Sequence, residues 1–400
     1  MTKSNEEIVL ITGGSGFLGQ HIIKLLLQEK DNLGIKEIRS IDLQPYTNEI
    51  GHPKSKDLIT YIGDVCKPDS LEMAFNGVST VFHCAGIVSI QYPPDYDELE
   101  RVNVDGTRNV IEMCVKHNVE RLIYTSCASV AFTPFKGHST FSVVINQTES
   151  SVSSPVHDPN RPLNDFDKSF LIPGYSSSKL RAENIVLNSN ETLLENRTDY
   201  LQTAAVRPPL IYGECDNHFM PAVLKYLAKR NNIIPRIAGA GGKQQLVYAG
   251  NAAWGHICTY KTLKANPRKI SGLAAFITDD TPINDIARFI QRIGRTSKHL
   301  RFKTSMWSIP HFVFFFLAFV IEMLVKLLYP VSKFNLNYSL RVLSSFTASV
   351  IMYNRLRASI HLDYEPIFDE NKSFELSTGW YEKWYEEHIG LGKIKTLKND

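Results

Sequence analysis

A tyrosine and a lysine four positions apart could form an acid–base pair. The stretch YSSSK, Tyr175 to Lys179, opens the helical pattern SSKLRAENIVL. Positions i and i+4 of a helix share a face, so the ammonium group would lie near the phenol and favour the phenolate. Such a phenol can take a proton from an alcohol or give one to a ketone. The same spacing occurs by chance in surface helices, so a catalytic interpretation needs a cofactor site beside it.

The segment TGGSGFLG, Thr12 to Gly19, predicts that cofactor site. It follows the apolar run EIVLIT and precedes the helical pattern QHIIKLLLQEK. Glycines in this spacing permit a tight turn, close approach of the backbone to a pyrophosphate and close packing of the helix, whose N-terminus offers amide groups. A purely structural glycine turn is the alternative. We predict that a dinucleotide is bound by Gly13, Gly14, Ser15, Gly16, Phe17, Leu18 and Gly19.

An aspartate at the end of the next predicted strand selects between the two nicotinamide dinucleotides. Asp42 ends IRSIDL, where a carboxylate can accept hydrogen bonds from ribose hydroxyls and repel a 2′-phosphate. NAD is therefore predicted rather than NADP, although a solvated aspartate at a strand end gives the same sequence. Positions after later strands complete the predicted cofactor site: Asp64 and Val65 near the adenine, Ala85 and Gly86 where small residues leave room, and Pro208.

Strand and helix patterns alternate through the first half of the chain and must position these residues. The strands are EIVLIT, IRSIDL, DLITYIGDV, STVFHCAGI and RLIYTSC, and a helical pattern, NVDGTRNVIEMCVKH, lies before the last. This alternation predicts an α/β fold with a Rossmann-type, doubly wound parallel sheet, in which ligands bind at the carboxyl ends of the strands. Residues 133–173 are polar and lack periodicity, which is typical of a functional or disordered loop.

Composition excludes several other classes of function. Lysine and arginine number 44 against 41 acidic residues, so a net charge of +3 gives no reason to expect a nucleic-acid partner. The six cysteines are scattered without a CxxC pair, which indicates neither a disulfide framework nor a metal site and suits a reducing compartment. The N-terminal MTKSNEEIVL lacks the pattern of a secretory signal.

Motifs in a fixed order along the chain resemble one enzyme family. The glycine spacing and YSSSK resemble the extended branch of the short-chain dehydrogenase/reductase superfamily. The segments GTRNVIEMC, LIYTSCASV, RPPLIYGE, LVYAGNAAWGH and FITDDTP resemble the 3β-hydroxysteroid dehydrogenase/Δ5-Δ4 isomerase family. The resemblance runs from about residue 7 to LDYEPIF and GWYEKWYEEH, which is nearly the whole chain.

The resemblance implies a membrane-associated enzyme that oxidises the 3β-hydroxyl of a Δ5 steroid with NAD+ and then moves the double bond to the conjugated 4-position. Tyr175 would take the hydroxyl proton, and Lys179 would hold the ribose. Asp279 and Asp280 of the DDTP segment would be proton-transfer candidates for isomerisation, although a helix cap and a turn explain them equally well. The resemblance also implies the endoplasmic reticulum or mitochondrial membrane, a catalytic part facing the cytosol and, as one assembly, a homodimer.

One position departs from the family pattern. Family members end this strand with two serines, of which the second hydrogen-bonds the substrate oxygen, and Cys127 occupies that position here. Ser126 would point to the opposite face of a strand, while Thr125 would share the face of Cys127 but lie about 6.6 Å back. A thiol is a weak donor, and losing a positioned donor costs on the order of 100- to 1000-fold in turnover. We predict Cys127 as the third catalytic-site residue; a merely packed cysteine is the alternative.

An apolar stretch after residue 300 predicts contact with a membrane. Residues 304–321 are almost free of charge, and Trp307 and Tyr329 lie where interfacial anchors occur. Glu322 and Lys326 would share a helical face, which also suits a helix lying in the interface. A helix buried over an apolar substrate cavity is the alternative.

We therefore predict four parts and leave three functions open. The parts are residues 1–205, an NAD-binding Rossmann domain with the polar insertion 133–173; residues 206–300, a smaller substrate-binding region interleaved with the core; residues 304–330, a membrane-associated segment; and residues 331–400, a C-terminal region. The leading function is an NAD-dependent 3β-hydroxysteroid dehydrogenase, with or without isomerase activity. The others are a 3-ketosteroid reductase or decarboxylating 4-carboxysterol 3-dehydrogenase, and a catalytically weak protein that binds a nucleotide and a sterol.

Overall fold

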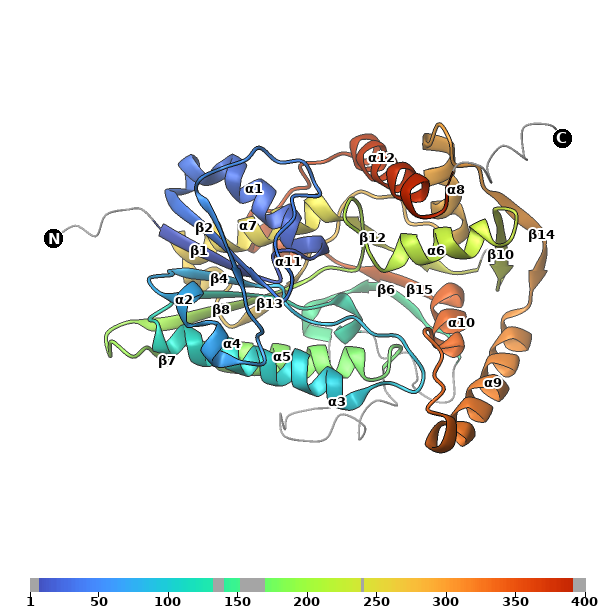
Figure 1. Ribbon diagram of the computed structural model, residues 1–400, viewed down its shortest axis with the longest axis horizontal. Helices are drawn as coiled ribbons and strands as arrows, with labels where there is room; N and C mark the ends of the chain where they lie inside the picture. The colour runs from blue at the N-terminus through green and yellow to red at the C-terminus, as the bar shows by residue number, and fades with distance from the viewer. Residues whose placement is uncertain (1–6, 132–139, 152–169, 239–240, 391–400) are drawn as a thin grey trace.

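A parallel sheet forms the centre of the molecule (Figure 1). The computed structural model describes residues 7–131, 140–151, 170–238 and 241–390. The sheet has eight strands in the order β13-β8-β5-β4-β1-β2-β3, with β7 paired to β8; only β7 is antiparallel. The strands are β1 Glu7–Thr12, β2 Ile35–Asp42, β3 Leu58–Ile62, β4 Thr80–His83, β5 Arg121–Thr125, β7 Thr192–Leu193, β8 Tyr200–Arg207 and β13 Leu273–Phe276. The predicted Rossmann-type sheet is confirmed.

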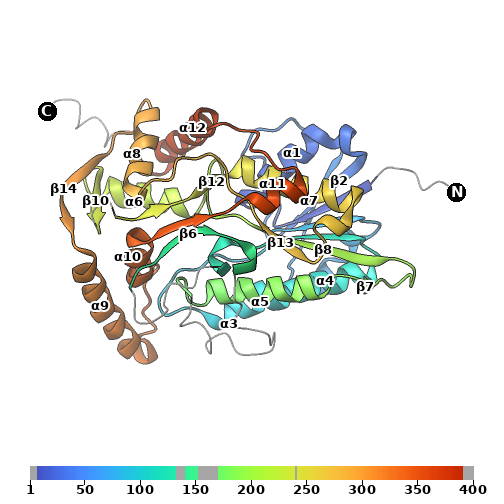
Figure 2. The same ribbon diagram turned by 180° about the vertical axis from the view of Figure 1, so that it is seen from behind.

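Helices cover both faces of this sheet, as Figures 1 and 2 show. One face carries α1 (Phe17–Leu33), α7 (Ala249–Ala265) and α11 (Leu356–Leu362); the other carries α2 (Glu72–Phe75), α4 (Gly106–Lys116) and α5 (Tyr175–Asn188). Because successive strand side chains point to opposite faces, Val9 and Ile11 of β1 join the first core and Leu10 joins the second. Burial on both faces explains why the strands read as continuous apolar runs.

A third apolar cluster lies beyond the carboxyl edge of the sheet. It contains side chains of α6 (Phe219–Ala228), α8 (Ile286–Thr296), α12 (Glu370–His388) and the parallel pair β9 (Leu210–Tyr212) and β12 (Leu246–Tyr248). The side chains of Asp285 and Asp369 cap α8 and α12 by accepting a hydrogen bond from a backbone N–H three residues later. Shorter helices are α3 Tyr96–Leu99, a π-helical stretch Glu100–Asp105, and 3-10 turns at Pro68–Ser70, Ala128–Ala131, Glu149–Ser151 and Pro267–Lys269.

Part of the polar segment 133–173 is ordered structure rather than the loop that its sequence suggests. Residues 132–139 and 152–169 lie outside the described residues, but between them β6 (Val143–Gln147) pairs in parallel with β15 (Val350–Tyr353). β15 also pairs with β11 (Lys243–Gln244). The Glu149 carboxylate accepts a hydrogen bond from the Phe276 amide at 2.8 Å, which ties the segment to β13. The sequence missed β6 because its pairing partner lies far along the chain.

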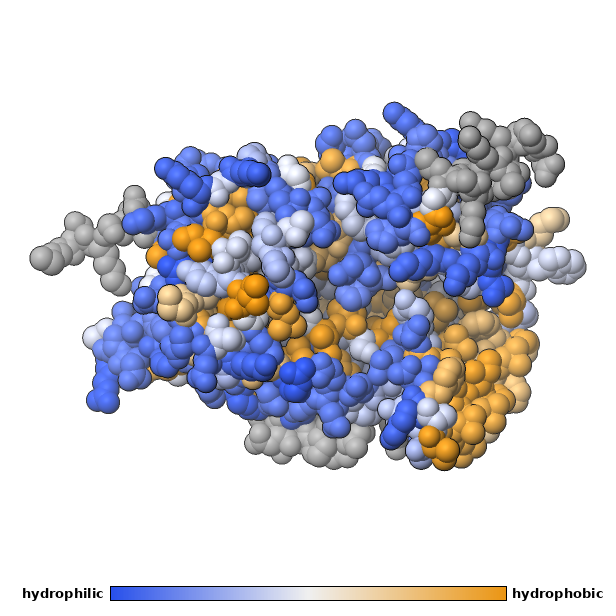
Figure 3. Space-filling view, in the orientation of Figure 1, coloured by the Kyte–Doolittle hydropathy of each residue, from blue (hydrophilic) through white to orange (hydrophobic). Residues whose placement is uncertain are grey.

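The apolar stretch after residue 300 begins as a strand. β14 (Lys303–Ile309) pairs in parallel with β10 (Ile233–Ile237), and only then does α9 (His311–Ser332) follow. α9 packs along α10 (Leu340–Ala348) and otherwise presents apolar side chains to the surface, seen as the orange region in Figure 3. By length and composition α9 is the one helix in the described ranges that could cross a membrane.

A buried ion pair between α5 and β8 gives a test of stability. The Arg207 Nε donates to a Glu183 carboxylate oxygen at 2.8 Å, a second guanidinium N–H binds the other oxygen, and both side chains are buried. Glu183→Gln should lower the free energy of unfolding by about 3–5 kcal/mol, because it leaves a buried cation without its anion. Urea unfolding monitored by circular dichroism measures this loss.

Glu387→Gln is the matched control, since Glu387 pairs with Lys383 on the exposed surface of α12. The control should leave the unfolding midpoint nearly unchanged. Equal destabilisation by the two variants would contradict the role assigned to the buried pair.

Candidate active site

The glycine loop connects β1 to α1 at the carboxyl edge of the sheet. Gly13 has φ +72°, and a Cβ there would lie 2.7 Å from the Ala85 amide nitrogen after β4. A Cβ on Gly19 would lie 2.2 Å from the Gly13 carbonyl oxygen. The loop is therefore held against the segment after β4 and against the first turn of α1. The close packing of the helix agrees with the expectation for such a turn, and binding of a pyrophosphate there stays a prediction. Gly14, Ser15, Gly16, Phe17 and Leu18 occupy the same turn and the start of α1.

Asp42 ends β2 directly beside this loop. One carboxylate oxygen accepts a hydrogen bond from the Ser15 amide at 3.0 Å, and the other accepts one from the Gln44 amide at 3.2 Å. Each carboxylate oxygen has a second lone pair, which could accept a ribose hydroxyl. The residue lies where an NAD-selecting carboxylate is expected.

The remaining predicted cofactor residues follow the ends of three other strands. After β3, the Asp64 carboxylate accepts the Cys66 amide at 2.9 Å, and Val65 packs against Gly106 of α4. After β4, a Cβ on Gly86 would lie 3.8 Å from the Lys179 Nζ, so Ala85 and Gly86 lie between the glycine loop and α5. After β8, the Pro208 carbonyl accepts the Ala128 amide at 2.9 Å. All lie along the edge where ligands bind in such sheets.

Tyr175 and Lys179 lie in the first turns of α5, as the YSSSK pattern predicted. Lys179 Nζ donates to the Thr125 carbonyl at 2.7 Å and stands over the Tyr124 ring at 4.3 Å. Burial lowers the pKa of Lys179 to about 8, and burial raises the pKa of Tyr175 well above its ordinary value, with Cys127 raising it further. The predicted lowering of the tyrosine pKa by Lys179 is not seen in this structure, because burial of the phenol dominates the shift.

Cys127 packs against Tyr175, but its neighbours differ from those predicted. β5 ends at Thr125, and a 3-10 helix begins at Ala128, so the strand alternation used in the prediction stops before Cys127. The Thr125 hydroxyl instead contacts Cys84 at 3.1 Å and His256 of α7 at 2.9 Å, on the opposite side of the sheet from α5. The expectation that Thr125 shares a face with Cys127 is therefore wrong.

Two hydroxyls that the sequence did not single out form a chain of hydrogen bonds that ends at the thiol. The Cys127 Sγ accepts hydrogen bonds from the Ser129 hydroxyl at 3.1 Å and the Ser129 amide at 3.4 Å. The Ser176 hydroxyl donates to the Ser129 oxygen at 3.0 Å. No local pattern reveals these contacts, because they depend on how the 3-10 helix meets α5.

Asn103 is another site residue that the sequence did not reveal. It is buried in the π-helical stretch, where its amide accepts the Ile87 N–H at 2.9 Å and donates to the Ile87 carbonyl at 3.1 Å and to the Ser178 hydroxyl at 3.0 Å. Its side chain therefore ties the segment after Gly86 to α5. An asparagine inside a predicted helix was the one available signal, since Asn is a poor helix former, and π-helical turns occur frequently at functional sites.

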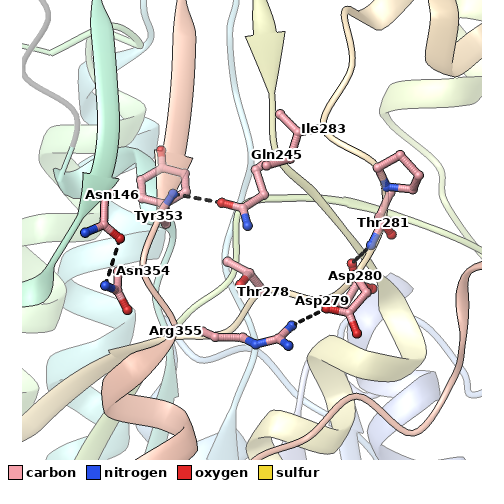
Figure 4. Close-up of a pocket in the computed structure, with 11 residues that line it drawn as sticks. Asn146, Gln245, Thr278, Asp279, Asp280, Thr281, Ile283, Tyr353, Asn354 and Arg355 are labelled. Carbon is pink, nitrogen blue, oxygen red and sulfur yellow. Dashed lines mark hydrogen bonds and ion pairs between the residues drawn. The ribbon is translucent and has the colours of Figure 1, made fainter.

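The two DDTP aspartates have different surroundings beside a polar pocket of about 520 Å³ (Figure 4). The Asp279 carboxylate accepts hydrogen bonds from the Tyr248 amide at 2.9 Å, the Asn251 side chain at 2.9 Å and the Thr281 amide at 3.0 Å. Burial raises its pKa. Asp280 is exposed and pairs with Arg355 at 2.8 Å in the pocket. Asp279 thus holds the residue before α7 and a turn within its own segment. The turn agrees with the structural alternative, but the cap of the following helix, α8, is Asp285 instead.

Metal and disulfide chemistry find no support in the part of the chain that the structure covers. All six cysteines are free thiols. No group of three His, Cys, Asp or Glu side chains that could hold a metal ion occurs among the described residues.

Comparisons with known proteins agree with this architecture. The model of the 3-beta hydroxysteroid dehydrogenase/isomerase family matches residues 10–306. Solved structures similar to this chain include a UDP-glucose 4-epimerase from Thermus thermophilus in complex with NAD, with 17% identity over 94% of this chain and 99% of that chain and a TM-score of 0.61. A UDP-glucuronic acid 4-epimerase from Bacillus cereus in complex with NAD matches with 15% identity, the same two coverages and a TM-score of 0.62. An epimerase from Methanothermobacter thermautotrophicus matches with 16% identity over 96% of this chain and 94% of that chain and a TM-score of 0.64. At these identities the structural likenesses show a shared fold.

The glycine loop offers a direct test of dinucleotide binding. Gly13→Ala should weaken binding of NADH at least about tenfold, because its new methyl group would meet the Ala85 amide at 2.7 Å and its φ of +72° would be strained. Titration of NADH fluorescence measures the affinity. Gly51→Ala is the matched control, since Gly51 has φ +70° with nothing within 4 Å of the new Cβ. Equal weakening in the two variants would refute close packing at the loop as the cause.

Proposed function

The chain belongs to the 3-beta hydroxysteroid dehydrogenase/isomerase family, and from this premise we propose that it oxidises the 3β-hydroxyl group of a steroid with NAD+. The observation that carries the proposal is the meeting of Tyr175, Lys179 and Cys127 at the carboxyl edge of the sheet, next to Gly86. A hydride-transfer site needs this combination of a nucleotide-binding edge and a phenol that can exchange a proton with the substrate oxygen.

The proposed cofactor site fits NAD. The loop Gly13–Gly19 would hold the pyrophosphate, and Asp42 would bind the ribose hydroxyls and disfavour a 2′-phosphate. When bound, NAD+ supplies the acceptor for the hydride that leaves carbon 3 of the steroid. Asn103 and Lys179 would fix the backbone after Gly86 and the start of α5 around this cofactor.

In the proposed oxidation Tyr175 takes the proton of the substrate hydroxyl. Burial raises the pKa of its phenol, so the neutral form prevails near neutral pH and the base form grows with rising pH. Lys179, whose pKa burial lowers to about 8, is charged below that pH and can stabilise the phenolate as it forms. The same protonated phenol would donate a proton in the reverse reduction, which is why a 3-ketosteroid reductase is the second candidate.

Asp280 is the better candidate for any isomerase step. Both aspartates line the pocket of Figure 4, but the Asp280 carboxylate is exposed, whereas Asp279 is buried and its oxygens accept three hydrogen bonds from the protein. A proton-transfer group must reach the substrate and change its protonation state, and the three hydrogen bonds that Asp279 accepts oppose both.

An activity assay tests the proposed dehydrogenase. Purified protein with NAD+ and a panel of 3β-hydroxysteroids should form NADH, and Tyr175→Phe should lower turnover at least about 100-fold because it removes the proton acceptor. The oxidation rate should rise nearly tenfold per unit between about pH 6 and about pH 8, since the phenolate fraction increases in that proportion below the pKa. Tyr200→Phe, at an exposed tyrosine of β8, is the control.

The products of this assay, or the absence of any product, distinguish the remaining candidate functions. A conjugated enone indicates isomerase activity, loss of CO2 from a 4-carboxysterol indicates the decarboxylating dehydrogenase, and NADH consumption with a 3-ketosteroid indicates the reductase. Binding of NAD+ and sterol without turnover, even after Cys127→Ser, would reject the enzyme in favour of a binding protein.

We also propose that α9 lies in the membrane interface without crossing it. Trp307 is 85% exposed and Met306 93% exposed at the end of β14, and most apolar side chains of α9 are exposed. The buried Glu322 carboxylate accepts the Ser339 hydroxyl at 2.7 Å and pairs with Arg341. These contacts hold α9 along α10, so a spanning α9 would draw polar groups of α10 into hydrocarbon. One apolar face and one protein-bound face suit an interfacial helix.

The linker between α9 and α10, residues 333–339, connects the exposed apolar surface of α9 to the proposed catalytic site. Tyr92 and Leu336 exchange backbone hydrogen bonds at 2.9 and 2.8 Å. Pro94, two residues on, lies 3.0 Å from the position that a Cβ of Gly174 would occupy, next to Tyr175. A sterol taken from the bilayer would thus meet a chain segment that borders the catalytic helix. The endoplasmic reticulum or mitochondrial membrane is the proposed location, by resemblance to the family.

Vesicle binding tests the proposed interfacial helix. Replacing Phe312 and Phe316 with serine should lower co-sedimentation with phosphatidylcholine vesicles about tenfold or more, because two exposed phenyl groups would no longer enter the acyl region. Ile360→Ser, at an exposed residue of α11, is the control and should bind as the unaltered protein does. Undiminished binding of the double variant would reject α9 as the anchor. With protease added outside sealed vesicles, cleavage at one end of α9 and protection of the other end would indicate that it spans.

A further inference from the structure

This inference rests on the proposed function. If the site oxidises a steroid hydroxyl, the thiol of Cys127 must replace the hydroxyl donor of the family's serine. A thiol is a weaker donor than a hydroxyl and orients less strongly toward an acceptor. Its effectiveness therefore depends on what surrounds the sulfur. Cys127 packs against Tyr175, so the sulfur borders the reacting phenol.

The sulfur accepts two hydrogen bonds from one residue. The Ser129 hydroxyl donates to Sγ at 3.1 Å, and the Ser129 amide approaches the same atom at 3.4 Å. The donors come from one side, because the chain turns into the 3-10 helix Ala128–Ala131 immediately after Cys127. Two donors on one side occupy the lone pairs of the sulfur and leave its single hydrogen for the other side.

The direction of this chain of hydrogen bonds is set by Ser176. Its buried hydroxyl donates to the Ser129 oxygen at 3.0 Å, so the Ser129 hydrogen is available for the sulfur. Ser176 is the neighbour of Tyr175 in the first turn of α5. Each hydroxyl in such a chain polarises the next, which strengthens the last donor.

We propose that Ser129 is a positioning residue of the active site, whose hydroxyl holds the acceptor side of the Cys127 sulfur and so aims the S–H group at the oxygen that reacts beside Tyr175. The path of donation runs from Ser176 to Ser129 to Cys127 and on to that oxygen. The pair Cys127 and Ser129 then supplies the positioned donor that the family obtains from one serine hydroxyl. The fold thereby keeps a donor at this point although the donor atom is sulfur instead of oxygen.

The other nearby hydroxyls do not have this role. The Thr125 hydroxyl lies against Cys84 and His256 on the α7 side of the sheet. The Ser126 hydroxyl is buried without a hydrogen-bond partner among the described residues, and its amide binds the Val206 carbonyl. Ser126 therefore serves as a matched control, since its replacement removes a neighbouring hydroxyl of the same kind.

Infrared spectroscopy tests the orientation of the thiol without requiring turnover. The protein has six cysteines. Subtracting the spectrum of Cys127→Ala from that of the unaltered protein leaves the S–H stretching band of Cys127 alone. Donation lowers the S–H stretching frequency, so Ser129→Ala should move this band to higher frequency and broaden it, while Ser129→Thr, which keeps a hydroxyl, should restore it. Ser126→Ala should leave the band unchanged. An unaltered band in Ser129→Ala overturns the proposal, whether or not any steroid is oxidised.

A double-mutant cycle tests the catalytic consequence. Ser129→Ala should lower kcat about five- to tenfold with little change in KM for the steroid, because it weakens a donor used as the oxygen reacts. In the Cys127→Ala background the same replacement should have no further effect, since no thiol remains to be aimed. Equal losses in the two backgrounds would show that Ser129 acts only through folding and overturn the proposal. Loss of NADH formation in every variant together with the expected band shift would reject the dehydrogenase alone.

Discussion

A buried neutral histidine holds together the segments that form the site. His83 ends β4, where its Nδ1 accepts the Thr12 hydroxyl at 2.7 Å and its Nε2 contacts the Thr107 hydroxyl at 3.0 Å. Because Thr107 donates to the Asn103 carbonyl at 2.6 Å, its oxygen is left to accept the Nε2 proton. Burial lowers the pKa of His83 to about 3, so the ring stays neutral and keeps one donor and one acceptor at physiological pH.

This network fixes the distance between the glycine loop and α5, which carries Tyr175 and Lys179. The Thr12 hydroxyl also accepts the Ala85 amide at 3.3 Å, which places the end of β4 against the glycine turn. Asn103 continues the network to Ile87 and to the Ser178 hydroxyl within YSSSK. Hydride transfer requires the nicotinamide and the substrate oxygen to meet with little freedom, and neutral, fully paired hydrogen bonds provide that rigidity.

The substrate side is assembled from segments that lie far apart in the chain. β6 from the polar segment pairs with β15 from the C-terminal part. The ring of Tyr353, at the end of β15, packs with Phe276 at the end of β13. α9 and the linker to α10 join the surface to the residues before the catalytic helix. The nucleotide half thus rests on consecutive βα units, whereas the proposed substrate half depends on long-range pairing.

The parallel sheet, the glycine loop, Asp42 at the end of β2 and the pair Tyr175–Lys179 on one helix could all be predicted from the amino-acid pattern. These features are local: buried strands read as apolar runs, and i to i+4 spacing places two side chains on one helical face. Only the tertiary structure decided which groups surround Cys127, because β5 ends at Thr125 and the following turn directs the thiol toward Ser129. It also decided that the tyrosine pKa is raised, since burial of the phenol depends on packing that no spacing in the sequence records.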